Sequence, residues 1–306
     1  MLVRIVVPPL GVLVTTLRTP ANMCVTKSKK IRRGGATIKS LGFLNSQSLK
    51  TLMRDAINHK DDIEKLRKTN IFFFCETWIT KNNESTIFKL YGNEIFENKT
   101  IFTVYADPAK GNKGMGRPSG GLQFAVNRNL GAKMFTQSKN HLGIKIGDLC
   151  IIGVYYPPKG DRAVIEEVAE DITKAIKAVP ENMHCIIAGD WNFKPDQPEF
   201  DALVELLNNE EYLLASDETV STMHETDSAW DHLFIREGTM LVKCDTDDSK
   251  PTWSDHKIIT AAHYGRYKEK FDEKELPEHK NCIGSTVFQV ILNSGGGYAE
   301  RICYLE

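Results

Sequence analysis

The chain has 306 residues, of which 41% are hydrophobic and 26% charged, a composition typical of a globular protein with one large core or two smaller ones. Its formal net charge of −1 conceals an uneven distribution. Residues 1–54 contain ten Lys or Arg and no Asp or Glu, whereas the remainder has 29 basic and 40 acidic residues. A phosphate-bearing partner must therefore be bound by a local basic surface and not by the overall charge.

The seven cysteines are scattered without a Cys-x-x-Cys pair, and Cys75, Cys150 and Cys185 lie in apolar runs. This spacing argues against a zinc site and against a disulfide framework, and it predicts buried thiols in a reducing compartment. No apolar run reaches the roughly 20 residues that a membrane-spanning helix needs, so we expect no membrane partner.

Residues 1–35 are expected to form a basic, flexible N-terminal segment. The apolar stretch Ile5–Leu17 resembles the core of a signal peptide, but two prolines and a glycine interrupt it. The basic cluster Lys27–Arg33 suits a nuclear address or an arm that contacts phosphates. A solvated tail and a mitochondrial presequence are the alternatives; we expect an intracellular protein located in the nucleus.

Strand and helix patterns alternate along the first part of the chain. Residues 37–44 are strand-like, and Ser46 or Ser48 can cap a following helix whose apolar residues recur at helical spacing. Residues 71–75 form an unbroken apolar run, which is typical of a strand covered on both faces. Glu76 follows this run directly, so it is either a carboxylate at a functional strand end or an ordinary solvated residue.

The rest of the chain continues the alternation. A loop at 107–121 contains Lys110, Lys113 and Arg117 among several glycines, and it suits either a polyanion contact or an ordinary mobile connection. Further elements are expected at 121–127 (strand), 148–156 (strand), 161–179 (helix), 185–188 (strand) and 199–207 (helix), with strands after Asp231 and His256. This order predicts an α/β fold with two sheets packed together and helices outside.

Polar residues stand at the ends of these strands. The buried run 185–188 stops at Gly189, and because residues i and i+2 of a strand point to the same side, Asp190 and Asn192 can address one point. A carboxylate and a carboxamide there suit Mg²⁺ or an attacking water, although the same residues also favour turns. An Asp-His pair, Asp255-His256, precedes the last of these strands, where a surface turn is the alternative.

Six short motifs occur in one order along residues 36–265. They are Asn45-Ser-Gln-Ser-Leu49, Glu76-Thr-Trp78, Val154-Tyr-Tyr-Pro-Pro158, Gly189-Asp-Trp-Asn192, Trp230-Asp-His232 and Ser254-Asp-His256. This order resembles the endonuclease/exonuclease/phosphatase superfamily of magnesium-dependent phosphodiesterases. The variant that it resembles most is the endonuclease domain of LINE-type (non-LTR) retrotransposons. That domain typically also has a sequence motif similar to Gly116-Arg-Pro-Ser-Gly-Gly121.

The resemblance implies a two-sheet α/β sandwich with outer helices over residues 36–265, followed by a charged C-terminal extension at 266–306. It also implies a metal site for Mg²⁺, with Mn²⁺ as a substitute, bound by Glu76, Asn45 and Asp255. Gln47 stands where some members of the superfamily carry an Asp that serves a second metal, so two ions are not claimed.

The resemblance further implies the catalytic roles. Asp190 would position and activate the attacking water, and Asn192 would steady the phosphoryl oxygens. His256, oriented by Asp231, would lie against the scissile phosphate. Tyr155 would contact the phosphate or the leaving oxygen. Thr222, where the superfamily often has a threonine, would be an additional contact.

The function that the sequence predicts is a Mg²⁺-dependent phosphodiesterase, a DNA endonuclease that nicks DNA by attack of water on a backbone phosphate. Three alternatives stay open. Two are nucleases of the same superfamily, directed at abasic sites or at RNA. The third is a catalytically silent domain that binds nucleic acid.

Overall fold

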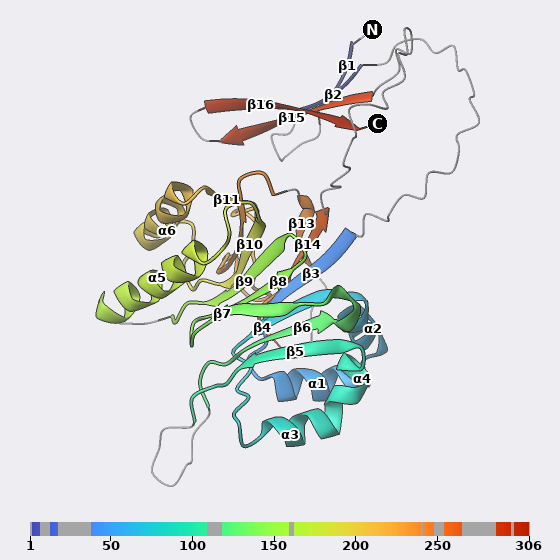
Figure 1. The fold of residues 1–306 in the computed structure, drawn as a ribbon, viewed down its shortest axis with the longest axis vertical. Coiled ribbons are helices and arrows are strands. Elements are labelled where there is room, and N and C mark those ends of the chain that lie inside the picture. The colour runs from blue at the N-terminus through green and yellow to red at the C-terminus, as the bar shows by residue number, and fades with distance from the viewer. Residues whose placement is uncertain are drawn as a thin grey trace, which may run out of the picture. The chain divides into compact units, whose positions relative to one another are not determined.

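The computed structural model (Figure 1) describes residues 2–6, 13–17, 38–108, 118–158, 162–239, 241–247, 254–264, 286–294 and 297–305. The chain divides into two compact units, residues 35–267 and the two chain ends, 1–34 with 268–306. The basic cluster Lys27–Arg33 and the loop residues Lys110, Lys113 and Arg117 lie outside the described residues.

The larger unit contains two six-stranded sheets, ordered β13-β14-β3-β4-β6-β5 and β11-β12-β10-β9-β8-β7. The strands of the first sheet are β3 (Ile38–Asn45), β4 (Ile71–Cys75), β5 (Lys99–Val104), β6 (Leu122–Asn127), β13 (Leu241–Asp247) and β14 (Ile258–Tyr264). Those of the second sheet are β7 (Lys133–Gln137), β8 (His141–Ile146), β9 (Leu149–Tyr155), β10 (His184–Asp190), β11 (Tyr212–Leu214) and β12 (Asp231–Arg236).

Each sheet has one parallel pair near its centre, β3 with β4 and β9 with β10, while the other neighbouring strands are antiparallel. In the first pair Asn45 lies opposite Cys75, and in the second Tyr155 lies opposite Asp190. Because the carboxyl ends of parallel strands meet at one edge, each pair delivers its terminal residues side by side. This register positions the polar strand ends that the sequence contains.

The core between the two sheets consists of apolar side chains from both, including Phe73 of β4 and Ile186 of β10. The close approach of the sheets depends on Gly153 of β9, where an added Cβ would lie 2.1 Å from the ring of Phe73. Cys75, Cys150 and Cys185 are buried free thiols, as predicted.

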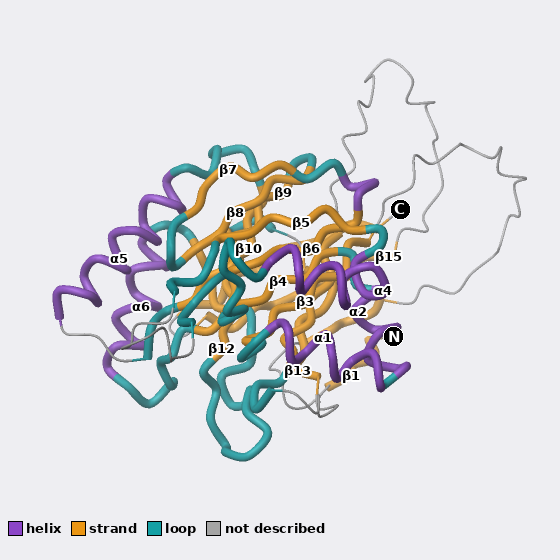
Figure 2. Tube along the Cα trace, turned by 90° about the horizontal axis from the view of Figure 1, so that it is seen from below, coloured by secondary structure: helices purple, strands orange, loops and turns teal. Residues whose placement is uncertain are grey.

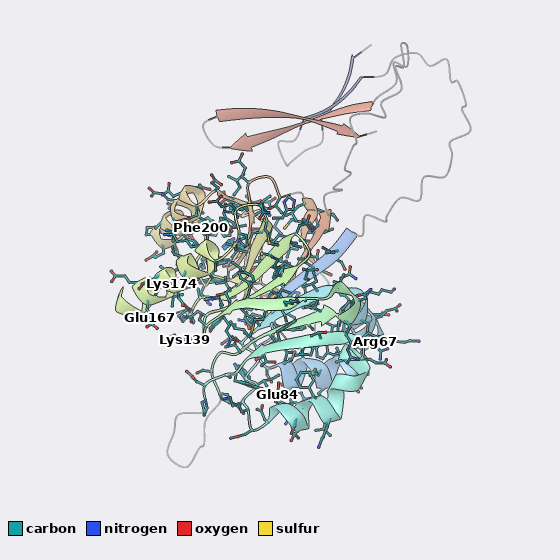
Figure 3. All side chains as sticks on the ribbon, in the orientation of Figure 1. Arg67, Glu84, Lys139, Glu167, Lys174 and Phe200 are labelled. Atoms are coloured by element: carbon teal, nitrogen blue, oxygen red, sulfur yellow. The ribbon has the colours of Figure 1, made fainter. Side chains whose placement is uncertain are left out.

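Helices cover the outer face of each sheet (Figures 1 and 2). The helices that pack on the first sheet are α1 (Leu49–Asn58), α2 (Lys60–Lys68), α3 (Glu84–Ile87) and α4 (Asn93–Phe96), with a π-helical turn at Phe88–Gly92 between the last two. The helices on the second sheet are α5 (Arg162–Lys177) and α6 (Pro198–Asn209), and an ion pair of 2.9 Å joins Lys139 to Glu167 of α5 (Figure 3). The two-sheet α/β sandwich with outer helices is therefore confirmed.

The helical segment after β3 begins as expected but does not continue unbroken. Ser48 caps α1, because its Oγ accepts a hydrogen bond of 3.3 Å from the amide of Thr51. The apolar positions Ile63 and Leu66 belong to a second helix, since His59 is in an extended conformation with φ −124°. The apolar periodicity carries across this break because both helices pack on the same sheet.

The smaller unit is a four-stranded antiparallel sheet with the order β1-β2-β15-β16. Its strands are β1 (Leu2–Val6), β2 (Leu13–Leu17), β15 (Thr286–Ser294) and β16 (Gly297–Leu305). The two ends of the chain thus pair with each other, which their sequences do not indicate. Among the residues that the structure describes, no helix is long and apolar enough to cross a membrane.

Candidate active site

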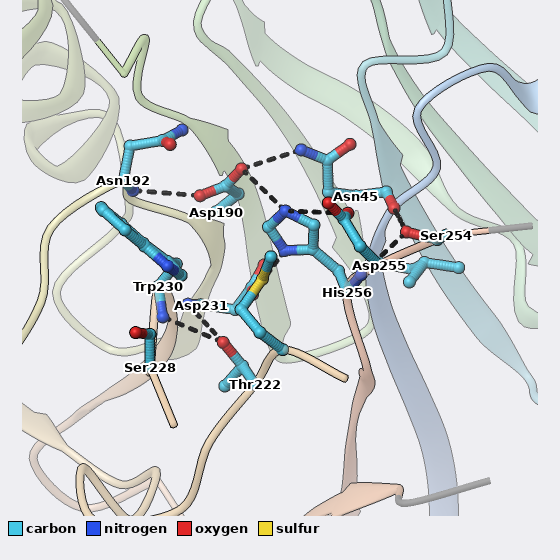
Figure 4. Close-up of polar contacts among 12 residues, drawn as sticks. Asn45, Asp190, Asn192, Thr222, Ser228, Trp230, Asp231, Ser254, Asp255 and His256 are labelled. Atoms are coloured by element: carbon cyan, nitrogen blue, oxygen red, sulfur yellow. Dashed lines mark hydrogen bonds and ion pairs between the residues drawn. The ribbon is translucent and has the colours of Figure 1, made fainter. Parts of the chain in front are cut away.

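The polar residues at the strand ends of the two sheets converge on one another (Figure 4). Asn45 ends β3 in the first sheet, and its Nδ2 donates hydrogen bonds of 3.0 Å to Glu76 Oε2 and 2.8 Å to Asp190 Oδ2. Tyr155, which ends β9 in the second sheet, donates through its hydroxyl to Glu76 Oε1 at 3.0 Å. Glu76 is therefore hydrogen-bonded from both sheets.

Asp190 lies at the end of β10 and is 1% exposed. The strand continues through Gly189, where an added Cβ would lie 1.9 Å from the carbonyl oxygen of Val154, so only glycine lets β10 pair this closely with β9. Burial raises the pKa of the Asp190 carboxyl, and the nearby His256 partly offsets this. The carboxylate of Asp190 is thus a group whose ionised form needs a cation beside it.

The backbone at Asn192 differs from the expected strand, in which Asp190 and Asn192 point to the same side. Asn192 has a left-handed φ of 53°. Its amide N–H donates to Asp190 Oδ1 at 3.0 Å, and its side-chain Nδ2 donates to the carbonyl of Tyr156 at 2.7 Å. The two residues are neighbours because the chain turns back onto Asp190. The expectation that they lie on the same side of one strand was therefore wrong.

His256 forms a buried pair with Asp231, and the pair joins the two sheets. Its Nδ1 lies 2.8 Å from Asp231 Oδ2, and its Nε2 lies 3.9 Å from Asp190 Oδ2 and 3.8 Å from Asp255 Oδ1. Burial alone lowers the pKa of His256, but the carboxylates, above all Asp231, outweigh burial and raise the pKa above its ordinary value. The imidazole is therefore a cation that donates through Nδ1 to Asp231.

Tyr155 is a hydrogen-bond donor at this site. Burial, with the adjacent Glu76 carboxylate, raises the pKa of the Tyr155 phenol far above its ordinary value. The hydroxyl therefore stays protonated, and it points at Glu76.

The charge of the site fits a divalent cation. The site contains four carboxylates, those of Glu76, Asp190, Asp231 and Asp255. The imidazole of His256 lies within ion-pair distance of the last three. Carboxylate and amide oxygens are the ligands that Mg²⁺ and Mn²⁺ prefer. Ligand atoms of Asp190, Asp231 and His256 lie within 4.8 Å of one another, but a protonated His256 that donates to Asp231 is not available to a metal.

The expected metal ligands are only partly assembled. Asn45 and Glu76 are in direct contact, and Asn45 Oδ1 also accepts from the amide of Gln47 at 3.1 Å. Asp255, whose side chain is 44% exposed, lies near His256 and, among the described residues, has no direct contact with Glu76. Both residues offer carboxylate oxygens, the donors that would hold a divalent cation.

Two further residues connect segments of the site, and the sequence did not single out the first of them, Ser254. Ser254 donates through Oγ to the carbonyl of Asn45 at 2.8 Å and accepts from the amide of His256 at 3.1 Å, so it ties the Asp-His segment to β3. Its place directly before Asp255 in the Ser-Asp-His motif was the available signal. Thr222 is 2% exposed, and its Oγ1 accepts from two backbone amides, those of Trp230 and Asp231.

Backbone strain concentrates at this site. Six described residues other than glycine have positive φ, and five of them lie in its loops: Gln47, Ser48, Glu76, Trp78 and Asn192. Such conformations cost free energy and persist where surrounding contacts impose them, commonly at functional sites. The contacts here include amides of Thr77 and Trp78 that donate to the carbonyls of Gly121 and Gly120, both at 3.1 Å.

No protein-family model matches the sequence, and no curated protein is similar to it in sequence. Several solved structures are similar in fold. The endonuclease domain of TRAS1, a telomere-specific non-LTR retrotransposon, has a TM-score of 0.53 and 17% identity, covering 74% of this chain and 99% of that chain. The AP endonuclease LMAP from Leishmania major has a TM-score of 0.58 and 10% identity, covering 75% of this chain and 88% of that chain.

The 3′ phosphatase NExo from Neisseria, in a structure bound to a product DNA hairpin, has a TM-score of 0.53 and 11% identity, covering 74% of this chain and 100% of that chain. At these identities the similarity concerns the fold. The chain therefore has the two-sheet fold of the endonuclease/exonuclease/phosphatase superfamily, as the order of its sequence motifs indicates.

Proposed function

We propose that this protein is a phosphodiesterase that requires Mg²⁺ or Mn²⁺ and nicks DNA by attack of water on a backbone phosphate. The observation that carries the proposal is the meeting of Glu76, Asp190 and the His256–Asp231 pair at one point between two sheets. A carboxylate pair, a buried imidazolium and a surplus of negative charge are what hydrolysis of a phosphodiester with a divalent cation needs. The nuclease and phosphatase neighbours in the fold comparison accord with this chemistry.

Each residue has a definite part in the proposed reaction. Asp190 takes the proton of the attacking water, and Asn192, whose amide bonds the Asp190 carboxylate, holds that carboxylate in place. His256 faces the phosphate as a cation, with its charge stabilised by Asp231. Tyr155 would contact the phosphate or the leaving oxygen, and to donate to either, its single hydroxyl proton must leave Glu76 Oε1.

Glu76, with Asn45 and Asp255, would hold the cation. When bound, the cation would screen the phosphate charge, stabilise the leaving oxygen and favour the ionised form of Asp190. Asn45 would have a second role. It donates hydrogen bonds to both Glu76 and Asp190, and it would therefore fix the spacing of the two carboxylates.

The substrate is the least constrained part of the proposal. DNA is favoured by the sequence motifs, which resemble those of the retrotransposon endonucleases. An abasic site in DNA is the second candidate, because two of the fold neighbours are AP endonucleases. These two substrates use the same phosphate chemistry and differ in what surrounds the phosphate.

The decisive substitution is Asp190→Asn, which keeps the size of the side chain but removes the charge that accepts a proton. Wild-type protein should nick supercoiled plasmid in Mg²⁺ and not in EDTA, and Asp190→Asn should lower turnover by roughly 10²-fold or more. The affinity for DNA should change little, because binding comes mainly from backbone contacts elsewhere. Asp201→Asn, on the exposed face of α6, is the matched control and should be fully active.

An abasic duplex and an RNA are tested beside the plasmid, which ranks the three substrates. Cleavage that persists in EDTA, or near wild-type turnover in Asp190→Asn, would contradict the proposal. Binding to DNA without cleavage of any of the three substrates would instead identify a silent binding domain.

A further inference from the structure

The Asp231–His256 pair is assembled from two different sheets. Asp231 is the first residue of β12 in the second sheet, whereas His256 precedes β14 in the first sheet. Their hydrogen bond of 2.8 Å therefore depends on how the entrances of these two strands are held relative to each other. A displacement of one strand entrance would separate the carboxylate from the imidazole without unfolding either sheet.

Thr222 is hydrogen-bonded to both strand entrances, and Figure 4 shows its bonds to the one at β12. Its Oγ1 accepts from the amide of Trp230 at 2.9 Å and from that of Asp231 at 3.2 Å. Its carbonyl oxygen accepts from the amide of Lys257 at 2.7 Å. One buried residue thus links the backbone directly before β12 to the backbone directly before β14.

The residues around Thr222 strengthen this link. Met223 forms a β-bridge with His256, and the amide of His224 donates to the carbonyl of Asp255 at 2.8 Å. The loop that follows is closed by Ser221, whose Oγ donates to the carbonyl of Thr226 at 2.6 Å. Residues 222–224 therefore run along the Asp255-His256 segment as a short, well-bonded strip.

We propose that Thr222 is a positioning residue that sets the distance between Asp231 and His256. Its Oγ1 accepts from the backbone amides of Trp230 and Asp231, so its hydroxyl oxygen is engaged with the strand entrance and not with another side chain. It acts through the pair, by fixing the two strand entrances from which the carboxylate and the imidazole project. The kinetic consequence rests on the proposed function, whereas the geometric one does not.

The first test compares Thr222→Val with Thr222→Ser. Valine keeps the branched shape but removes the acceptor of two buried amides, and serine keeps the acceptor. Thr222→Val should lower kcat roughly 10- to 100-fold with little change in KM. Activity typically falls by this factor when a residue that orients catalytic groups is lost. Thr222→Ser should restore kcat to within about threefold of wild type, since it keeps the hydrogen-bond acceptor.

Thr239→Val is the matched control for a purely structural effect. Thr239 is also buried, at 7% exposure, and its Oγ1 accepts from the amide of Cys185 at 3.2 Å, away from the candidate site. This variant should lose stability to heat as Thr222→Val does, but it should keep kcat. Equal loss of kcat in both valine variants would overturn the proposal, because it would show that general destabilisation is sufficient.

Coupling to Asp231 gives the second test. If Thr222 acts through the pair, Thr222→Val combined with Asp231→Asn should be hardly slower than Asp231→Asn alone. A double variant whose loss equals the product of the two single losses would show that Thr222 acts independently, and would overturn the proposal.

A spectroscopic measurement separates this inference from the proposed function. The His256 Nδ1 proton, bonded to a carboxylate, should give a downfield proton NMR signal, assigned by its loss in His256→Ala. The signal should persist in Thr222→Ser and Thr239→Val and disappear or shift in Thr222→Val. This result in a protein that cleaves nothing would uphold the positioning role while the proposed function fails. An unchanged signal in a folded Thr222→Val protein would overturn the positioning role.

Discussion

Among the described residues, no basic side chain forms an ion pair with Glu76. Its two carboxylate oxygens accept hydrogen bonds from Asn45 and Tyr155, and both partners are neutral. The left-handed φ of 47° shows that the backbone gives up a relaxed conformation at this residue. A carboxylate that is oriented by neutral donors, on a strained backbone, is suited to receive a cation from solution.

Glu76→Gln should therefore weaken metal binding by at least roughly tenfold, because an amide retains the hydrogen-bonding shape but loses the charge. Titration of Mn²⁺ by calorimetry without substrate measures this directly. Glu199→Gln, on the exposed side of α6, should bind Mn²⁺ as the wild type does. An unchanged Mn²⁺ affinity in Glu76→Gln would remove Glu76 from the metal site.

His263 is a buried histidine in β14, fully shielded from solvent. Burial, with Lys39 and His184 nearby, lowers its pKa to about 4, and Asp148 opposes this only in part. In the unfolded chain a histidine has a pKa near 6.5, so the unfolded state binds the extra proton first as pH falls. The stability that neutral His263 contributes is thus complete above about pH 6.5 and is lost as pH falls toward 4.

The expected loss across this window is up to about 3 kcal/mol, from 1.36 kcal/mol for each pKa unit. Urea unfolding of wild type and His263→Leu at pH 7 and at pH 4.5 measures it, and the leucine variant should show the smaller decrease. His59→Gln, at an exposed position between α1 and α2, should decrease as the wild type does. Parallel losses in wild type and His263→Leu would contradict the assignment.

Three strands that are covered on both faces were predicted from the sequence, whereas the edge strands and the largely buried β8, His141–Ile146, were not. Residues 71–75, 149–155 and 184–190 are buried over nearly their whole length, so they read as unbroken apolar runs. The edge strand β7, Lys133–Gln137, is largely exposed, and the edge strand β13 includes Lys243 and Asp245, so neither shows an apolar pattern.

The same reasoning explains which features of the site could be predicted. Side chains that end central parallel strands, such as Asn45 and Asp190, were predictable because the register of these pairs follows from burial. The turn at Asn192 was not, since its left-handed conformation depends on the hydrogen bond to Asp190 and not on strand periodicity. The pairing of β2 with β15 joins segments about 270 residues apart, and local patterns cannot reveal such a contact.

The loop that supports Glu76 depends on a glycine pair. Gly121 has a φ of 89°, and an added Cβ would lie 2.5 Å from Thr77 Oγ1. Its carbonyl accepts from the amide of Thr77 at 3.1 Å, next to Glu76. A side chain at 121 would therefore push directly on the segment that carries the proposed metal ligand.

Gly121→Ala should destabilise the protein by about 1–3 kcal/mol and also lower turnover, because it combines a disfavoured φ with a steric overlap beside Glu76. Gly131→Ala is matched in backbone, with φ 61°, but nothing lies within 4 Å of its added Cβ. It should cost roughly 1 kcal/mol and leave turnover unchanged. Thermal unfolding and plasmid nicking distinguish the two; equal turnover would show that the glycine at 121 serves only the fold.

At the scale of the molecule, the candidate site exists only where the two sheets meet. Asn45 bonds Asp190 across the sheets, and His256 bonds Asp231 across them. The densest basic cluster of the sequence, Lys27–Arg33, contains none of these site residues. In the proposed function, the catalytic residues and the main basic cluster therefore belong to different parts of the chain, and they can be altered separately.

This separation predicts the effect of neutralising the cluster Lys27–Arg33. The test replaces the five Lys and Arg residues of the cluster with Gln in the full chain. A truncation would also remove β1 and β2, and β2 pairs with β15. The slope of log affinity against log salt should become shallower by about 0.9 for each side chain that contacts a phosphate. Turnover at saturating DNA should not change, since none of the site residues is touched.

Lys174→Gln with Lys177→Gln on α5 is the control, because these lysines are paired with Glu170 and Glu210 and should contribute nothing to the slope. Fluorescence anisotropy on a labelled duplex over a range of salt concentrations measures both proteins. A slope identical to wild type after neutralisation would show that the cluster serves as a cellular address or a solvated tail. DNA would then have to be held by the unit that contains the candidate site, despite its acidic composition, because no other basic cluster of this density occurs in the sequence.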